Sequence, residues 1–83
     1  MKILYFAWLR ERVGVPEEVI ALPENVRTVG EVITHLSSLG ENYAYAFEQP
    51  SIIRAALDRK HVPLETPLGE ARELALFPPM TGG

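Results

Sequence analysis

The start of the chain is dominated by apolar residues that lack the polar face of a helix. Residues 2–9 form a nearly continuous aliphatic and aromatic run, which predicts a buried strand. Residues 18–22 form a second β-prone run, and Gly14, Val15 and Pro16 between the two runs favour a turn. The pattern therefore predicts a β-hairpin at the start of the chain.

The middle of the chain carries the pattern of one amphipathic helix. Thr28 and Glu31 stand at the spacing of a capping box, in which the hydroxyl and the carboxylate satisfy free backbone N–H groups at a helix start. We predict a helix from Thr28 to Gly40, since glycine is a common C-terminal stop. Residues 42–48 predict at most one or two further turns of helix. The apolar stripe of the main helix consists of Val29, Val32, Ile33, Leu36 and Leu39.

Short β-prone runs fill the rest of the chain. Residues 52–57 read as a strand, residues 58–60 as a polar turn, and His61 and Val62 as a short return strand. Residues 73–77 form a last strand that the next two prolines cannot extend, because proline offers no N–H to a ladder. The order ββαββ, with room for a small extra helix, predicts an α+β fold. Its plan is that of a ubiquitin-like β-grasp roll, a mixed sheet covered on one face by one main helix.

Length and composition fit one ordinary domain spanning residues 1–83. Of its 83 residues, 47% are hydrophobic and 23% are charged, as in soluble globular proteins. A net charge of -3 does not indicate a basic surface that could bind a polyanion, so we expect no nucleic-acid partner. The longest apolar run falls far short of the ~20 residues that cross a bilayer, and no signal-peptide pattern follows Met1. We therefore expect a cytoplasmic protein without a membrane partner.

The last six residues, 78–83, form a tail with an unusual composition. Pro78 and Pro79 give it a stiff, polyproline-like start, and Gly82 and Gly83 leave a terminal carboxylate on a thin stalk. Glycine suits a narrow channel, because a Cβ would clash with the channel walls. An extended arm of this kind projects the terminus by on the order of 15–20 Å. Two terminal glycines alone would also fit a disordered end or a cloning remnant. The strand that precedes them positions the terminus, however, and so favours a flexible tail that reaches into a partner.

The chain has no cysteine, which excludes disulfides, thiolate metal sites and a cysteine nucleophile. Acyl chemistry at the terminus needs a partner that activates the carboxylate, most simply with ATP to give an acyl-adenylate. Attack by a sulfur donor would then leave a thiocarboxylate on Gly83. His35 and His61 have no second ligand at metal spacing, and no phosphate loop or catalytic triad pattern is present, so we expect no metal and no permanently bound cofactor.

Both ends of the chain resemble the small, sulfur-carrier subunit of molybdopterin synthase. Residues 6–14 are similar to the first strand of that family and to the segment that follows this strand. Residues 73–83 are similar to its signature of an apolar strand, Phe-Pro-Pro, one apolar residue and Thr-Gly-Gly. The resemblance covers nearly the whole chain. One departure is that Glu70-Ala71-Arg72 stands where the family often has a Gly-Asp turn.

The resemblance implies a role for the terminus and a set of partners. Gly83 would be adenylated by an E1-like enzyme that uses ATP, then thiocarboxylated by a donor such as a cysteine desulfurase or rhodanese. Thr81 and Gly82 would thread into the large subunit, where the sulfur passes to cyclic pyranopterin monophosphate. Molybdopterin has two dithiolene sulfurs, so two carriers and a heterotetramer are expected. The carrier itself would be non-catalytic, since the catalytic groups belong to the large subunit.

Strand parity suggests where a partner docks. Along the first strand, Ile3, Tyr5 and Ala7 share one face, whereas Leu4, Phe6 and Trp8 share the other. The same parity in the last strand leaves Phe6 and Phe77 as candidates for an exposed apolar patch, with core packing as the alternative. The residues that we expect to dock partners are Phe6, Phe77, Pro78, Pro79 and Met80.

Several alternatives remain open on the sequence alone. The chain could carry sulfur for thiazole synthesis or another thiolation pathway. It could instead be a ubiquitin-like modifier whose Gly83 joins target lysines, or an interaction domain whose glycines have no role. Residues 10–12, Arg-Glu-Arg, fit a solvated charge cluster better than a partner contact.

Overall fold

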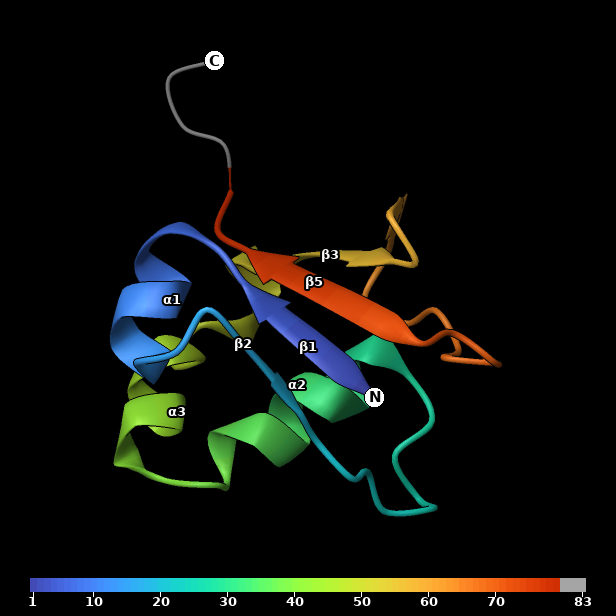
Figure 1. The fold of residues 1–83 in the computed structure, drawn as a ribbon, viewed down its shortest axis with the longest axis horizontal. Helices are drawn as coiled ribbons and strands as arrows, with labels where there is room; N and C mark the ends of the chain where they lie inside the picture. The colour runs from blue at the N-terminus through green and yellow to red at the C-terminus, as the bar shows by residue number, and fades with distance from the viewer. Residues whose placement is uncertain (80–83) are drawn as a thin grey trace.

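The computed structural model describes residues 1–79. The sheet has the order β2-β1-β5-β3-β4. Its β1 and β5 are parallel and its other neighbours are antiparallel, so the predicted mixed sheet and α+β class are confirmed (Figure 1). The elements in chain order are β1 (Lys2–Tyr5), α1 (Ala7–Val13), β2 (Glu17–Val19), α2 (Val29–Ser37), α3 (Glu41–Ala46), the 3₁₀ helix η1 (Pro50–Ile52), β3 (Arg54–Leu57), β4 (Lys60–Val62) and β5 (Glu73–Phe77).

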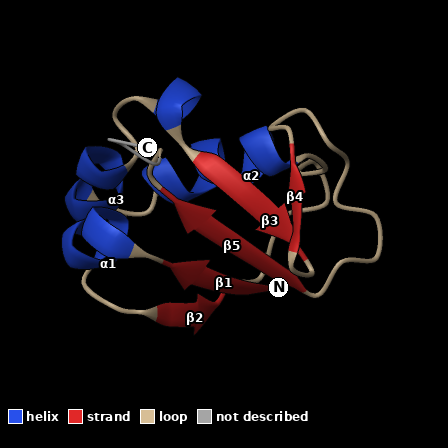
Figure 2. Ribbon diagram, turned by 90° about the horizontal axis from the view of Figure 1, so that it is seen from above, coloured by secondary structure: helices blue, strands red, loops and turns tan. Residues whose placement is uncertain are grey.

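One hydrophobic core lies between the sheet and its helices. Helix α2 covers one face of the sheet, as predicted, while α1 and α3 gather at one end of the strands (Figures 1 and 2). Within β1 (Lys2–Tyr5) and β5 the predicted parity is confirmed, because alternate residues of both strands point into this core. The fully buried side chains include Ile3, Tyr5, Leu9, Val29, Val32, Ile33, Leu36, Ile53, Leu74 and Leu76. No helix within residues 1–79 is long and apolar enough to span a membrane.

The predicted strand over residues 2–9 is wrong in its second half. Ala7 adopts a φ of 55°, in the left-handed region, and the extended chain breaks there and continues as α1. Leu9 and Val13, four residues apart, then point into the core from α1. Trp8 therefore lies on a helix, and neither it nor Ala7 belongs to a face of the sheet.

The predicted hairpin is a strand pair joined through this helix. β1 and β2 pair antiparallel, and the Tyr5 N–H donates to the Pro16 carbonyl at 2.9 Å. Gly14 ends α1 with a φ of 101°, and its N–H donates to the Arg10 carbonyl at 2.9 Å. Gly14, one of the three residues that predicted a tight turn, thus ends helix α1.

Helix α2 begins where the sequence predicts and ends three residues before the predicted stop at Gly40. Glu31 N–H donates to Thr28 Oγ1 at 3.2 Å, and Thr28 N–H donates to Glu31 Oε1 at 3.0 Å, which confirms the capping box. Hydrogen bonds from the Arg27 and Thr28 backbone lower the pKa of Glu31. The helix ends at Ser37 and not at Gly40, and the Ser38 hydroxyl donates to a carbonyl of the last turn.

The remaining boundaries shift by a few residues. The predicted strand over residues 52–57 starts only at Arg54, because Pro50 opens the 3₁₀ helix η1 just before it. The second strand is shorter than the predicted 18–22 and starts one residue earlier. The short helix expected within 42–48 forms α3, and β5 has the predicted bounds.

The turn between β3 and β4 fixes the start of β5 as well. Asp58 and Arg59 have φ angles of 46° and 72°, so both residues lie in the left-handed region that a two-residue type I′ hairpin requires. Asp58 Oδ1 accepts the backbone N–H groups of Arg72 and Glu73, each at 3.0 Å. These bonds hold the segment before β5, where the sequence departs from the Gly-Asp turn of the resembled family.

Replacement of Arg59 by glycine is expected to stabilise the fold. A non-glycine residue in the left-handed region costs roughly 1–2 kcal/mol, and glycine adopts that conformation without a steric penalty. Urea denaturation of Arg59→Gly should therefore give a free energy of unfolding about 1 kcal/mol higher, and alanine at the same position should give none of this gain. A stability equal to that of the unchanged chain would contradict the turn geometry.

Candidate functional site

The last described strand, β5, occupies the centre of the sheet and ends at Phe77. β5 lies between β1 and β3, and Phe77 pairs in register with Arg54. On the other side the Phe6 N–H donates to the Leu76 carbonyl at 3.1 Å. The sheet ends at Pro78, because neither proline can donate to a neighbouring strand. We call Phe77, Pro78 and Pro79 the tail exit.

The sheet face opposite α2, which we call the open face, is apolar near the tail exit. Leu4, Ala75 and Ala56 follow one another across β1, β5 and β3 on this face. The His61 ring on β4 meets the Phe77 ring edge to face, with their centroids 5.2 Å apart. The open face therefore presents small side chains at its centre and aromatic rings at the tail exit.

The structure brings the two predicted aromatic residues to the same end of neighbouring strands. Phe6 caps the start of α1 and exposes 47% of its surface, and Phe77 is half-buried on the open face. Pro78 and Pro79 are also half-buried. Their role in docking stays a prediction. The other candidate site residues, Met80, Thr81, Gly82 and Gly83, lie outside the described residues.

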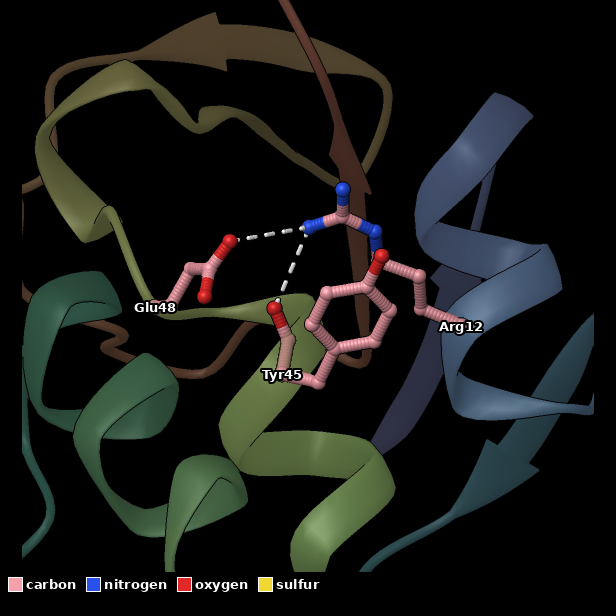
Figure 3. A network of polar contacts seen from close by, with 3 residues as sticks. All are labelled: Arg12, Tyr45 and Glu48. Atoms are coloured by element: carbon pink, nitrogen blue, oxygen red, sulfur yellow. Dashed lines mark hydrogen bonds and ion pairs between the residues drawn. The ribbon is translucent and has the colours of Figure 1, made fainter.

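Sequence reasoning missed a second feature, a stacked arginine beside α1. The Arg12 guanidinium lies 4.4 Å from the centroid of the Trp8 ring and 3.9 Å from that of Tyr45. Its Nη1 donates to the Tyr45 carbonyl at 3.2 Å and pairs with Glu48 Oε1 at 3.5 Å (Figure 3). This arginine is therefore not part of a freely solvated charge cluster. The only sequence signal is the i, i+4 spacing of Trp8 and Arg12 on a helix that the strand prediction obscured.

The ionisable side chains with shifted pKa values serve the fold. The Tyr5 and Tyr43 hydroxyls donate to the same Glu18 oxygen, at 2.8 and 2.7 Å, and so tie β1 and α3 to β2. Burial, followed by the Glu18 hydrogen bond, raises the pKa of Tyr43 to about 12 and raises that of Tyr5 further. Both tyrosines stay protonated at neutral pH, so this network holds α3 against the sheet and offers no acid or base.

The described part of the chain holds no cluster of metal-ligating side chains. Residues 1–79 contain no group of three histidine, aspartate or glutamate side chains that could hold an ion. His61 instead contacts Phe77, and His35 lies in the last turn of α2. Within residues 1–79 the candidate site therefore consists of the apolar open face and the aromatic residues at the tail exit.

Comparison with known proteins identifies the family of the chain. The model of the ThiS family matches residues 3–83, and the chain belongs to this family. The molybdopterin synthase sulfur carrier subunit of Haemophilus influenzae is 35% identical over 83 residues, which cover 100% of this chain and 99% of that protein. The subunit of the same name from Escherichia coli K12 is 34% identical, with the same coverage. The predicted resemblance is thus confirmed.

Solved structures share the fold over nearly the whole chain. A Pyrococcus furiosus protein assigned as molybdopterin converting factor subunit 1 superposes with a TM-score of 0.73 at 26% identity, covering 95% of each chain. Small archaeal modifier protein 1 from Haloferax volcanii superposes with a TM-score of 0.72 at 24% identity, covering 96% of this chain and 97% of that one. These neighbours confirm the predicted ubiquitin-like β-grasp fold.

Proposed function

We propose that the chain carries sulfur for molybdopterin synthesis as a thiocarboxylate on Gly83. The observation that carries the proposal is the full-length similarity to two sulfur carrier subunits of molybdopterin synthase, which extends through the terminal glycines. The absence of cysteine from the sequence supports it, because a sulfur cargo then needs an attachment point other than a thiol. The position of β5 at the centre of the sheet supports it further, since a partner can surround the chain end.

The proposed chemistry has three steps at the terminal carboxyl group. The Gly83 carboxylate first attacks the α-phosphorus of ATP on an E1-like enzyme, which forms the acyl-adenylate and releases pyrophosphate. The terminal sulfur of a persulfide on a donor such as a cysteine desulfurase or rhodanese then attacks the carbonyl carbon and displaces AMP. A thiol of a partner enzyme cleaves the resulting acyl disulfide, which leaves the thiocarboxylate on Gly83 and a disulfide on the partner. The thiocarboxylate is a nucleophile at neutral pH and needs no side chain of the carrier for its activation. A cytoplasmic location, with access to ATP, belongs to this proposal.

The docking surface completes the proposed function. We place the large subunit of the synthase against the open face, with Phe6, Phe77, Pro78, Pro79 and Met80 in the interface. Thr81 and Gly82 then lead Gly83 into the active site of that subunit, where the thiocarboxylate attacks cyclic pyranopterin monophosphate. The half-buried Leu4, Ala75 and Phe77 on the open face, with the exposed Phe6 beside them, support this placement, because an apolar patch of this kind marks an interaction surface. Two sulfurs per product imply a heterotetramer of two small and two large subunits.

Reconstitution tests the pathway. The thiocarboxylated chain, mixed with the large subunit and the pyranopterin precursor, should yield molybdopterin, measured by fluorescence of its oxidised derivative. The untreated chain, which has a carboxylate terminus, is the matched control and should yield none. Sulfur transfer only to a thiazole-forming enzyme, or stable linkage of Gly83 to lysines of other proteins, would contradict the proposal and favour the corresponding alternative.

A further inference from the structure

A small cleft lies between α1 and the segment that joins α3 to η1. Six residues line it: Trp8, Arg12, Ala46, Glu48, Gln49 and Ile52. One wall is the Trp8 ring, the charged groups are Arg12 and Glu48, and Ile52 closes the apolar side. We call it the Arg12 cleft.

With its volume of about 250 Å³, the Arg12 cleft has room for one or two side chains of another molecule. Arg12 is held in place by its two aromatic neighbours and by the Tyr45 carbonyl. A guanidinium carries five N–H donors, and both polar contacts of Arg12 within residues 1–79 use Nη1. The Nε and Nη2 edges therefore remain available to an incoming acceptor.

The Arg12 cleft adjoins the tail exit. Ile52 lines the cleft, and its carbonyl accepts a hydrogen bond of 3.4 Å from Arg54, the residue that pairs with Phe77. On the other side, α1 follows directly from Phe6. Both views show the end of β5 on the side of the sheet where α1 and α3 lie (Figures 1 and 2). A protein that encloses the tail exit therefore also meets this cleft.

The charges around the Arg12 cleft favour an acidic occupant. Arg12 lines the cleft, Arg54 donates to the carbonyl of the lining residue Ile52, and Glu48 is the one carboxylate in the cleft lining. The side chain of Arg12 is 26% exposed and that of Glu48 is 56% exposed, so the anion is the more mobile and more solvated partner of their pair. An exposed pair of this kind contributes little to stability, so a better-placed carboxylate can displace Glu48.

We propose that the Arg12 cleft receives an acidic side chain of the large subunit, as a second anchor beside the open face. The inference rests on the proposed function, since it takes the large subunit as the partner. The carboxylate binds the free edge of the Arg12 guanidinium, while neighbouring apolar groups pack on Trp8 and Ile52. Tryptophan, tyrosine and arginine are the residue types that dominate binding energy at protein interfaces. Trp8 and Arg12 line the cleft, and the Tyr45 ring stacks on Arg12.

Two substitutions with opposite expected effects test this proposal. Calorimetric titration of the full chain with the large subunit should show binding at least about tenfold weaker for Arg12→Gln, because the incoming carboxylate loses its partner. Glu48→Gln should strengthen binding about threefold, because it removes the competing anion. Arg27→Gln, on the far side of the fold beside Glu24, is the matched control and should bind like the unchanged chain.

The possible outcomes distinguish a failure of the cleft proposal from a failure of the proposed function. Binding of Arg12→Gln equal to that of the unchanged chain would overturn the proposal, provided that thermal unfolding shows a folded variant. Weaker binding of Glu48→Gln would also overturn it, since the occupant would then be basic. A defect confined to the activating enzyme would assign the cleft to that partner instead. Failure of the unchanged chain to bind the large subunit would contradict the proposed function itself.

Discussion

A chain that lacks Gly83 is expected to deliver no measurable sulfur to the pyranopterin precursor. The deletion moves the terminal carbonyl back by about 3.3 Å along an extended tail, so the reacting atom no longer reaches the active site of either partner. Because misplacement by ~1 Å can cost about 100-fold in rate, we expect a loss of at least that size. The rate of molybdopterin formation in the reconstituted synthase measures the effect.

Binding of the same deletion variant separates chemistry from docking. The core and the open face lie within residues 1–79, so the variant should unfold at the same temperature as the unchanged chain. It should also bind the large subunit with an affinity close to that of the unchanged chain, because the aromatic residues of the tail exit remain. Retained sulfur transfer in the absence of Gly83 would refute its assignment as the sulfur-bearing residue.

The second large effect is expected from Phe77→Lys, which should strongly weaken assembly with the large subunit. The substitution places a charge at the apolar end of the open face and removes the ring that contacts His61. An interface hot spot costs at least about 2 kcal/mol when it is lost, which corresponds to roughly 30-fold weaker binding. Size-exclusion chromatography and calorimetry of the mixed subunits measure the loss.

Two controls make the result specific. Phe77→Leu keeps an apolar side chain and should retain most of the affinity. Val19→Lys adds the same charge on the edge strand β2, where Val19 is 79% exposed and pairs with Lys2 at the opposite end of the sheet from the tail exit. This variant should assemble normally. Normal assembly of Phe77→Lys would exclude the docking role, and equal losses in both lysine variants would indicate a general effect of charge.

Elements with strong local signals could be predicted from the sequence. The capping box at Thr28 and Glu31 depends on two side chains and the backbone next to them, and β5 is bounded by the prolines that follow it. Helix α1 could not be predicted in this way, because its first residues, Ala7 to Leu9, continue an apolar run that starts in β1. Its start depends on the left-handed conformation of Ala7, which alanine rarely adopts.

The candidate site was predictable in part for the same reason. Phe77 lies on β5, whose parity is clear from the sequence, and the tail follows it directly along the chain. Phe6 follows β1 directly. The Arg12 cleft is different, since it joins α1 to residues more than 30 positions later. No periodicity within either segment indicates that Trp8, Arg12 and Tyr45 stack, because their contact depends on how α1 and α3 pack at the end of the sheet.

The most direct test of the central claim is the intact mass of the chain after incubation with an E1-like enzyme, ATP and a sulfur donor. We predict a mass gain equal to the exchange of one oxygen for one sulfur, located at Gly83 by fragmentation of the C-terminal peptide. The gain should disappear when ATP is omitted. An unchanged mass under conditions in which the acyl-adenylate forms would contradict the assignment of this chain as a sulfur carrier.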